Sequence, residues 1–329
     1  MADDIDIVIA WVDGNDQVWR AEKNRFSGVA NIDDTKRFRD WENLQFLFRG
    51  IEKCAPWVRY IHFVTVGHMP MWLNTQHPKL RIVNHEEFIP SKYLPTFNSN
   101  TIDMNFHRIP GLSEQFVYFN DDMFLLRNVK ESDFFIKGKP RGHIFEMPTI
   151  PLYGDVFPHI LFNNVEIINR HFSKREVIRQ HFWKYYSPRY GKTALRNLQY
   201  LRIRKFLGFQ NLHLPSALLK STYQTLWERE ERILTEACAN RFRSKSDVNQ
   251  YLIQEWQWLS GEVVPQSSRI GKYYDIGKDS EKVIGDIEKR KYKMVCINDT
   301  CSDEEYVVMK PRVLAAFNSI LPSKSMYEV

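Results

Sequence analysis

The sequence predicts an α/β protein with a mostly parallel, Rossmann-like sheet flanked by helices and an inserted basic helical arm. Short apolar runs and helical apolar spacing alternate over the first half of the chain. Two apolar runs stop in acids: residues 5–12 lead into Asp13-Gly14, and residues 116–119 lead into Asn120-Asp121-Asp122. Ligands of open α/β sheets bind beyond the carboxyl ends of the strands, so we expect both acidic ends to border one crevice.

The elements of the first half follow in a regular order. Residues 5–12 form the first expected strand, and helical spacing follows over residues 44–55, with Asp40 expected to cap its start and Pro56 to end it. Further elements are strand-like runs at 60–66 and 80–83, a helix near 99–108 that Pro110-Gly111 stops, and the strand before Asn120. Strands that alternate with helices favour a doubly wound sheet.

The second half opens with a change of composition. Residues 169–207 are rich in lysine, arginine and aromatic residues and contain one acid, Glu176. Helical patterns at 216–239 and 246–259 follow, and then a strand at 294–297 that ends in Asn298-Asp299. The sequence therefore predicts a main domain made of residues 1–165 and 208–329, interrupted by a basic helical insertion at 166–207.

Bulk composition narrows the class of protein. The chain has 329 residues, of which 43% are hydrophobic, and a formal charge of +6 that favours anionic partners: nucleic acid, acidic lipid or phosphorylated small molecules. Four scattered cysteines give neither a disulfide framework nor a Cys-x-x-Cys spacing, so we expect reduced packing residues. Without a signal peptide or a run of roughly 18 apolar residues, a cytoplasmic location is expected.

Carboxylates at strand ends suggest a metal site. Asp121 and Asp122, with Asn298 and Asp299 at the later strand end, offer the oxygen ligands that Mg²⁺ or Mn²⁺ accepts when it bridges to substrate phosphates. The alternative for the first pair is an Asx turn. Asp13-Gly14 is also a common turn signal, so it could simply close a loop.

Other residues suit an anionic donor. Arg37 and Asp40 precede a helix amino terminus, where an anion is favoured, and Asn98, His107 and Arg108 lie at the two ends of one short helix. His213, expected just before a helix, is a candidate general base, and Arg243 could brace a phosphoryl group. Solvated loops and helix caps are the structural alternatives for these residues.

The basic insertion allows three interpretations. Its mixture of aromatic and basic residues suits an acidic lipid surface and equally suits a nucleic acid. The third is a solvated helical arm whose aromatic face packs on the main domain.

The motifs together resemble the Stealth family. Residues 5–16 resemble its first conserved region, and residues 37–58, 94–99, 107–114 and 119–124 resemble its second. His213-Leu214-Pro215 and residues 241–244 look like a third region, and Ile297-Asn298-Asp299 with residues 321–328 look like a fourth. Order and spacing agree over nearly the whole chain.

The resemblance implies a bacterial sugar-1-phosphate transferase that moves hexose-1-phosphate, for example GlcNAc-1-phosphate, from a UDP-sugar to a hydroxyl of an acceptor glycan. It also implies capsular or exopolysaccharide synthesis, Mg²⁺ or Mn²⁺, and a sheet related to GT-A glycosyltransferases. We expect His213, Arg243 and Asp122 to be catalytic, with Asp13, Gly14, Arg37, Asp40, Asn98, His107 and Arg108 at the donor. A lipid-linked acceptor and peripheral contact with the inner membrane face are expected, without nucleic acid.

Two other functions are weighed against this one. A metal-dependent glycosyltransferase uses the same donor and similar acids but breaks the bond between sugar and oxygen. A nucleic-acid-binding protein would use the basic aromatic arm, bind in a salt-sensitive way and need no metal.

Overall fold

The computed structural model describes residues 4–27 and 39–329, so Arg37 lies outside the described residues. Its central sheet has the order β3-β2-β1-β4-β8. The strands are β1 (Ile5–Ala10), β2 (Ile61–Thr65), β3 (Leu80–Asn84), β4 (Gln115–Asn120) and β8 (Ser216–Leu219). All neighbours pair in parallel except β8, which runs antiparallel to β4. The expected mixed α/β fold with a mostly parallel sheet is confirmed.

A second sheet is joined directly to the first. It has the order β10-β11-β5, made of β10 (Gly271–Asp275), β11 (Met294–Asn298) and β5 (Met123–Leu125). The strand expected at 294–297 is therefore confirmed, but it belongs to this sheet, parallel to β10 and antiparallel to β5. Since β4 ends at Asn120 and β5 begins at Met123, Asp121 and Asp122 form the link between the sheets. A smaller sheet contains β6 (Phe135–Ile136), β7 (Lys139–Gly142) and β9 (Val264–Pro265).

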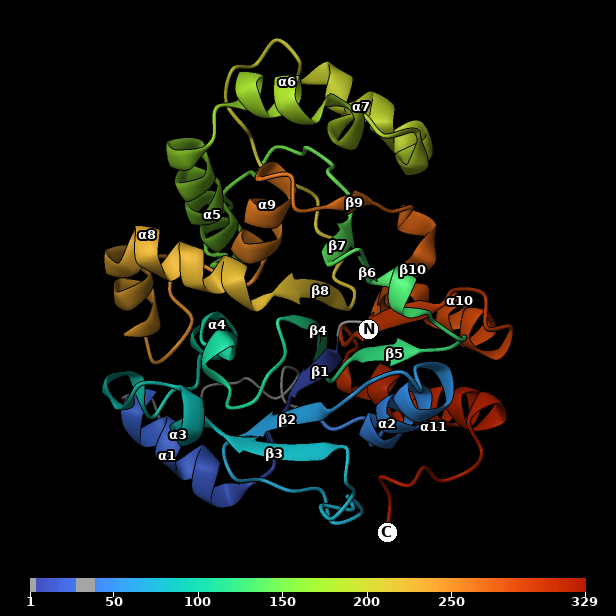
Figure 1. Cartoon of the computed structure of the whole chain (residues 1–329). Helices are drawn as coiled ribbons and strands as arrows, with labels where there is room; N and C mark the ends of the chain where they lie inside the picture. The colour runs from blue at the N-terminus through green and yellow to red at the C-terminus, as the bar shows by residue number, and fades with distance from the viewer. Residues whose placement is uncertain (1–3, 28–38) are drawn as a thin grey trace.

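Helices cover both sheets (Figure 1). Alpha-helices of the described residues are α1 (Gln17–Ser27), α2 (Leu44–Cys54), α3 (His85–Phe88), α4 (Ser99–Met104), α5 (Phe157–His171), α6 (Lys174–Tyr185), α7 (Ala194–Gln199), α8 (Lys220–Cys238), α9 (Tyr251–Leu259), α10 (Ile276–Glu288) and α11 (Asp303–Ile320). Within the described ranges, none of them combines the length and apolar character that a membrane span requires.

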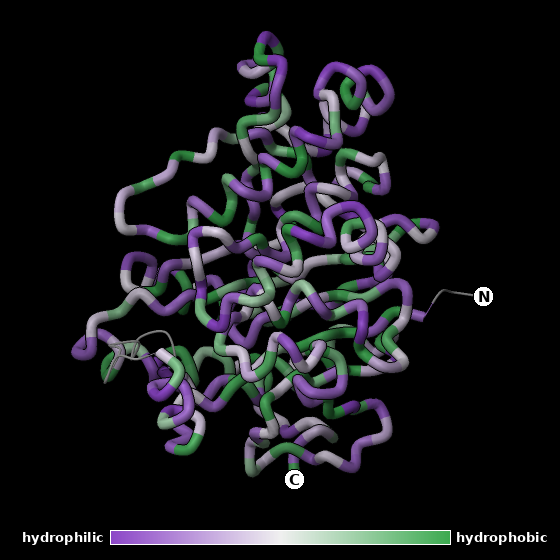
Figure 2. The backbone as a smooth tube through the Cα atoms, turned by 90° about the vertical axis from the view of Figure 1, so that its left-hand side faces the viewer, coloured by the Kyte–Doolittle hydropathy of each residue, from purple (hydrophilic) through white to green (hydrophobic). Residues whose placement is uncertain are grey.

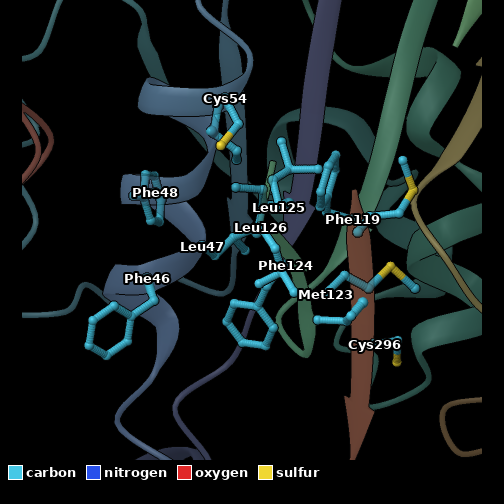
Figure 3. Packing of buried hydrophobic residues seen from close by; sticks show 14 of the residues in the cluster. Phe46, Leu47, Phe48, Cys54, Phe119, Met123, Phe124, Leu125, Leu126 and Cys296 are labelled. Atoms are coloured by element: carbon cyan, nitrogen blue, oxygen red, sulfur yellow. The ribbon is translucent and has the colours of Figure 1, made fainter. Parts of the chain in front are cut away.

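Successive side chains of β1 point to opposite faces of the central sheet, and each face carries its own hydrophobic core. Ile7 and Ile9 pack with α2, β5 and α11, whereas Val8 packs on the opposite face with α8 and α9. On the first face, side chains of α2 and β5 interlock beside Cys296 of β11 (Figure 3). Gly50 of α2 allows this close approach, because a Cβ there would lie 2.9 Å from the backbone oxygen of Leu125. The four cysteines are free and buried, as expected.

Three local expectations were wrong. Helix α2 begins at Leu44 after Asn43, so Asp40 does not cap it; Asp40 instead accepts a hydrogen bond from the backbone of Glu42 at 2.7 Å. The helix expected near 99–108 breaks at Asn105 into α4 and a 3₁₀ turn. Residues 216–219 form β8 rather than the start of α8, because β4 offers them a free edge to pair with, so His213 precedes a strand.

The basic insertion is anchored to the main body. Helix α5 runs through the expected boundary at 165/166 without a break. Glu146 is buried where it accepts hydrogen bonds from Lys174 Nζ at 2.7 Å and Tyr185 Oη at 2.6 Å. Tyr185, Tyr190 and Phe206 are buried as well, so part of the aromatic content packs inward.

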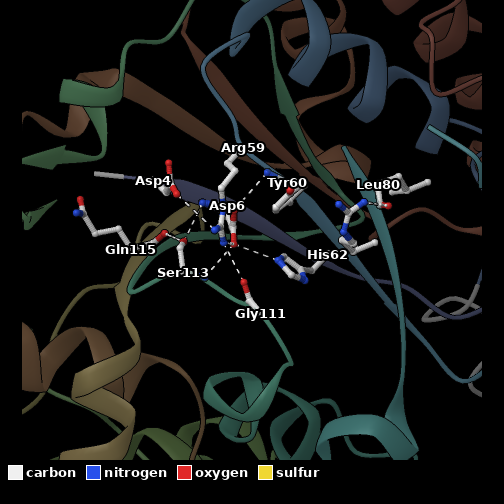
Figure 4. Close-up of polar contacts among 10 residues, drawn as sticks. Asp4, Asp6, Arg59, Tyr60, His62, Leu80, Gly111, Ser113 and Gln115 are labelled. Atoms are coloured by element: carbon white, nitrogen blue, oxygen red, sulfur yellow. Dashed lines mark hydrogen bonds and ion pairs between the residues drawn. The ribbon is translucent and has the colours of Figure 1, made fainter. Parts of the chain in front are cut away.

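A buried carboxylate fixes the amino ends of the central strands (Figure 4). Asp6 of β1 accepts hydrogen bonds from Arg59 Nη2 at 2.6 Å and from the backbone of Ser113 at 2.9 Å, and it lies 3.1 Å from His62 Nε2. Burial alone would raise the pKa of Asp6, but the hydrogen bonds from Arg59, His62 and Ser113 outweigh it and hold the pKa well below its usual value. The carboxylate therefore stabilises the fold.

Replacing Asp6 with asparagine should lower the free energy of unfolding by about 2–3 kcal/mol at pH 7, because Arg59 and His62 lose their charged partner. A lowered folded pKa gives stability that is complete above the unfolded value of about 3.9 and is lost as the pH falls through the folded pKa. Urea unfolding of Asp6→Asn and wild type should therefore differ at pH 7 and converge in acid. A difference that stays constant down to acidic pH would contradict this role.

Candidate active site

Three strand ends meet beside the link between the sheets. In the β1–β4 pairing Ala10 lies opposite Asn120, so both strands end at the same edge, from which the chain leads to Asp13 and to Asp121. The backbone nitrogen of Ile297 donates to Asp122 O at 2.9 Å and extends the β5–β11 pairing by one residue. The next residue, Asn298, thus comes beside Asp121. The chain path brings the predicted acidic ends together.

Asp122 lies at the centre of a compact cluster of possible ligands. Its Oδ2 accepts a hydrogen bond from the Cys296 thiol at 3.2 Å and lies 3.9 Å from His213 Nε2. The ligand atoms of Asp122, His213 and Cys296 all lie within 4.8 Å of one another. The second oxygen, Oδ1, is buried and has no hydrogen-bond partner among the described residues. An unpaired buried carboxylate oxygen is costly unless a cation or donor meets it.

The surroundings disfavour negative charge on both aspartates. Burial raises the pKa of Asp122 to about 6, and the hydrogen bond from Cys296 offsets part of that effect. The pKa of Asp121 rises to about 7, first through desolvation and then through the charge of Asp122. Solvent reaches the exposed side chain of Asp121 and weakens the effect there. A bound cation would favour both carboxylates in their charged form.

The residues fit a divalent cation. The orphaned Oδ1 of Asp122 and the adjacent carboxylate of Asp121 are oxygen donors that suit Mg²⁺ or Mn²⁺, while Asn298, whose Nδ2 donates to Asp275 Oδ1 at 3.3 Å, keeps its amide oxygen as a predicted ligand. His213 and Cys296 add softer donors, which a site for Mg²⁺ alone would not need. We therefore keep Asp121, Asp122 and Asn298 as the candidate ligands.

Asp299 was predicted as a fourth ligand, but it is engaged elsewhere. Its Oδ2 accepts a hydrogen bond from Trp41 Nε1 at 3.0 Å and lies 3.4 Å from Arg39 Nε, while its Oδ1 accepts from the backbone of Cys301. Arg39 is therefore a mostly buried ion-pair partner rather than part of a solvated loop. The carboxylate of Asp299 holds Arg39 in place here, and its role as a metal ligand stays a prediction.

His213 is held with its Nε2 toward Asp122. The residue has a positive φ of 47°, and its ring contacts Asn120 at the end of β4. Nδ1 is hydrogen-bonded to the Tyr251 hydroxyl, and Asn120 Nδ2 lies 3.4 Å from Nε2 as a donor. Asn120 is itself oriented by Tyr118, which bonds to its Oδ1 and to Asp103. With Asn120 donating to Nε2, Nδ1 carries the proton and donates to the Tyr251 hydroxyl, so Nε2 is the unprotonated nitrogen.

The electrostatics of His213 suit a proton acceptor. Burial, together with the positive charge of Arg243, lowers its pKa to about 4. The imidazole is neutral at pH 7 and can accept a proton at Nε2. Arg243 is exposed, and its Nη2 donates to Ser99 Oγ at 2.8 Å.

The loop of Asp13 and Gly14 lies beside a polar recess, and Asp40 is part of its lining. The Asp13 carboxylate accepts from the backbone of Asn15 at 2.8 Å, its own backbone nitrogen donates to His68 Nδ1, and Gly14 O accepts from Arg20. A recess of about 220 Å³ opens beside this loop. It is lined by Asn15, Arg20, Arg39, Asp40, Glu42, Tyr306 and Lys310. The lining combines three cations with two carboxylates and two neutral polar groups.

Asn98 and His107 were predicted at the donor, and in the structure both take part in buried packing contacts. Asn98 is fully buried, and its Nδ2 donates to Asp247 Oδ2 at 2.8 Å and to Asn240 O at 3.1 Å. The His107 ring is buried and stacked on Tyr223 of α8. Arg108 lies over the Trp227 ring, 4.9 Å from its centroid, and donates to Asn105. These three residues hold the α4 region against α8.

Sequence reasoning missed Cys296, Tyr251, Asn120 and Tyr118. Cys296 stood in an apolar run and had only a packing role in the sequence. Tyr251 opens helix α9, far from His213 in the chain, and no local pattern connects the two. Asn120 carried a usable signal, because it ends the same strand as the aspartates.

Comparison with known proteins places this site in a family. The family model described as Stealth protein CR1, conserved region 1, matches residues 3–28, and Stealth protein CR2, conserved region 2, matches residues 37–141. Capsular polysaccharide phosphotransferase WcwK of Streptococcus pneumoniae is 40% identical over 98% of each chain. Receptor polysaccharide phosphotransferase WefC of Streptococcus gordonii is 40% identical over the full length of both chains.

Two further matches complete the comparison. Exopolysaccharide phosphotransferase cps2G of Lactiplantibacillus plantarum is 37% identical, over 99% of this chain and 96% of the relative. Among solved structures, the galactosyltransferase LgtC covers 96% of both chains with a TM-score of 0.41 and 11% identity, a likeness that carries no conclusion about function. Full-length relatives at 40% identity and two matching conserved regions lead to one conclusion: the chain belongs to the Stealth family and is a phosphotransferase.

Proposed function

We propose that this protein transfers hexose-1-phosphate from a UDP-sugar to a hydroxyl of an acceptor glycan, forming a phosphodiester in capsular or exopolysaccharide synthesis. The observation that carries the proposal is the full-length similarity to capsular and exopolysaccharide phosphotransferases. The neutral His213 beside Asp121 and Asp122 supports it, because these groups match what phosphoryl transfer needs. A lipid-linked acceptor at the cytoplasmic face of the membrane belongs to the same proposal.

In this mechanism the acceptor hydroxyl attacks the phosphorus that carries the sugar. His213 Nε2 takes the hydroxyl proton, the new oxygen–phosphorus bond forms, and the bond to the nucleoside phosphate breaks, so that nucleoside monophosphate leaves. Asp121, Asp122 and Asn298 would hold Mg²⁺ or Mn²⁺, which supplies charge neutralisation at the diphosphate. Arg243 offers its exposed guanidinium to the transferring phosphoryl group.

Donor binding is assigned to the loop after β1 and the adjoining recess. Asp13 and Gly14 shape the loop, and Arg20, Arg39 and Lys310 bring positive charge to the recess. Arg39 pairs with Asp299 and Lys310 pairs with Glu42. These ion pairs orient the two cations as hydrogen-bond donors toward the recess.

The position of the β-phosphorus tests the reaction type. We expect UDP-GlcNAc, UDP-glucose or UDP-galactose labelled with ³²P at the β-phosphorus to give labelled sugar phosphate or acceptor, together with unlabelled UMP. A glycosyltransferase would leave the label in released UDP. Excess EDTA should stop turnover and added Mn²⁺ should restore it; labelled UDP, or full turnover in EDTA, contradicts the proposal.

A further inference from the structure

Apolar side chains face solvent at the end of the molecule that α6 and α7 form (Figure 1). Trp183 is 76% exposed and Leu195 is 63% exposed. Phe182, Leu198, Leu201 and Ile203 are exposed beside them along the chain. We call the exposed residues of 182–205 the arm surface. Exposed apolar groups in such number mark an interaction site more often than isolated ones do.

The arm surface is also strongly basic. Between Glu176 and Glu228 the chain contains no acidic residue. Exposed cations occur throughout the arm surface: Arg189, Lys192, Arg196, Arg202, Arg204 and Lys205. Figure 2 shows hydrophilic and hydrophobic residues alternating at this upper end of the molecule. The positive charge specifies an anionic partner.

The arm surface stands on an ordered base. Asn197 Nδ2 donates to Ile144 O at 2.7 Å and to Tyr185 O at 3.0 Å, both inside the protein. Asn169 exchanges hydrogen bonds with the backbone of Phe206. Tyr185 and Phe206 are buried, so the apolar side chains that stay exposed belong to the outer side of a folded unit.

The base of the arm is linked to the active site. The backbone nitrogens of Met147 and Thr149 donate to Gly208 O and Leu207 O, which pairs the loop before α5 with the end of the arm. This loop leads to Phe157, whose ring lies edge-on to Tyr251, the hydrogen-bond partner of His213. These contacts connect the base of the arm with the residue that holds His213.

We propose that the arm surface docks on an anionic lipid membrane. The arginines and lysines meet lipid phosphates, while Trp183 and the leucines enter the boundary between headgroups and acyl chains. Beside the aromatic Phe182 and Trp183, the other exposed apolar side chains, Leu195, Leu198, Leu201 and Ile203, are aliphatic and offer no face on which a base could stack, which favours lipid over polynucleotide. The proposal concerns attachment of the protein and stands apart from the reaction assigned to the site.

Vesicle sedimentation of the full-length protein tests the docking surface. We expect binding to vesicles of phosphatidylcholine with phosphatidylglycerol and little binding to phosphatidylcholine alone. Trp183→Ser with Leu198→Ser should weaken binding at least roughly tenfold. Arg202→Gln with Arg204→Gln should weaken it roughly thirtyfold at low salt. Met71→Ser with Met326→Ser, which removes exposed apolar groups away from the arm, should bind like wild type.

Three results would overturn the proposal: equal binding to both vesicle types, wild-type binding by the Trp183/Leu198 variant, or tighter binding to oligothymidylate than to the anionic vesicles. Circular dichroism of each variant confirms that it is folded. Because no donor is present, loss of vesicle binding is separate from failure of the reaction. Donor turnover to UMP in solution should be unchanged in the arm variants.

Discussion

Asp122→Asn should reduce hexose-1-phosphate transfer by about a thousandfold, because metal stabilisation of a phosphoryl-transfer transition state is worth several kcal/mol. The substitution removes the charge from the residue whose Oδ1 is buried without a partner among the described residues. Asparagine keeps the shape of the side chain and can still accept the hydrogen bond from Cys296. Initial rates of UMP release at saturating Mn²⁺ measure the effect.

The metal role has a readout that does not depend on turnover. Calorimetric titration of Mn²⁺ into the donor-free protein should show weaker binding in Asp122→Asn than in wild type. Glu281→Gln is a matched control, since it removes one exposed carboxylate that pairs with Arg312 between α10 and α11. Transfer at the wild-type rate by Asp122→Asn would exclude Asp122 from the mechanism.

His213→Asn should lower kcat by roughly a thousandfold with a smaller change in KM, as expected for loss of a general base. Asparagine tolerates the positive φ of this position better than other replacements, so the backbone is preserved. The imidazole has a lowered pKa and is already neutral at pH 7, so the loss reflects the missing acceptor nitrogen.

Tyr251→Phe separates proton acceptance from orientation. It removes the hydroxyl that bonds to His213 Nδ1 but keeps the ring that packs beside Phe157. We expect roughly a tenfold fall in kcat, well short of the effect of His213→Asn. Equal effects from both variants would show that His213 serves only to maintain the local structure, and a normal rate in His213→Asn would remove it from the chemistry.

The sequence predicted the strands that are marked by a local run of apolar residues. The largely apolar runs at β1, β2 and β4 identified their strands because central strands covered on both faces are mostly apolar, whereas β3, at the sheet edge, was found from a shorter run that includes the exposed Arg81. β8 was missed because its four residues lead straight into α8, and only the free edge of β4 selects the extended form. The assignment of β11 to a second sheet depends on its pairing with β5, which no local pattern reports.

The sequence predicted those site residues that lie at the ends of strands. Asp121, Asp122 and Asn298 come together because the chain reverses directly after β4 and pairs with β11. Asp299 lies one residue further, yet its carboxylate turns to Arg39 and Trp41. Asn98 and His107 show that polar residues that serve buried packing have the same sequence appearance as ligands. Side-chain direction and long-range partners are tertiary properties.

The close packing of Gly50 in α2 against Leu125 in β5 affects the position of the candidate active site. Strand β5 starts directly after Asp122. The distance between α2 and β5, which Gly50 keeps short, therefore also influences where Asp121 and Asp122 lie relative to His213. Relatives that differ at Gly50 or in β5 are therefore expected to differ in the distance between Asp122 and His213 even where both residues are kept.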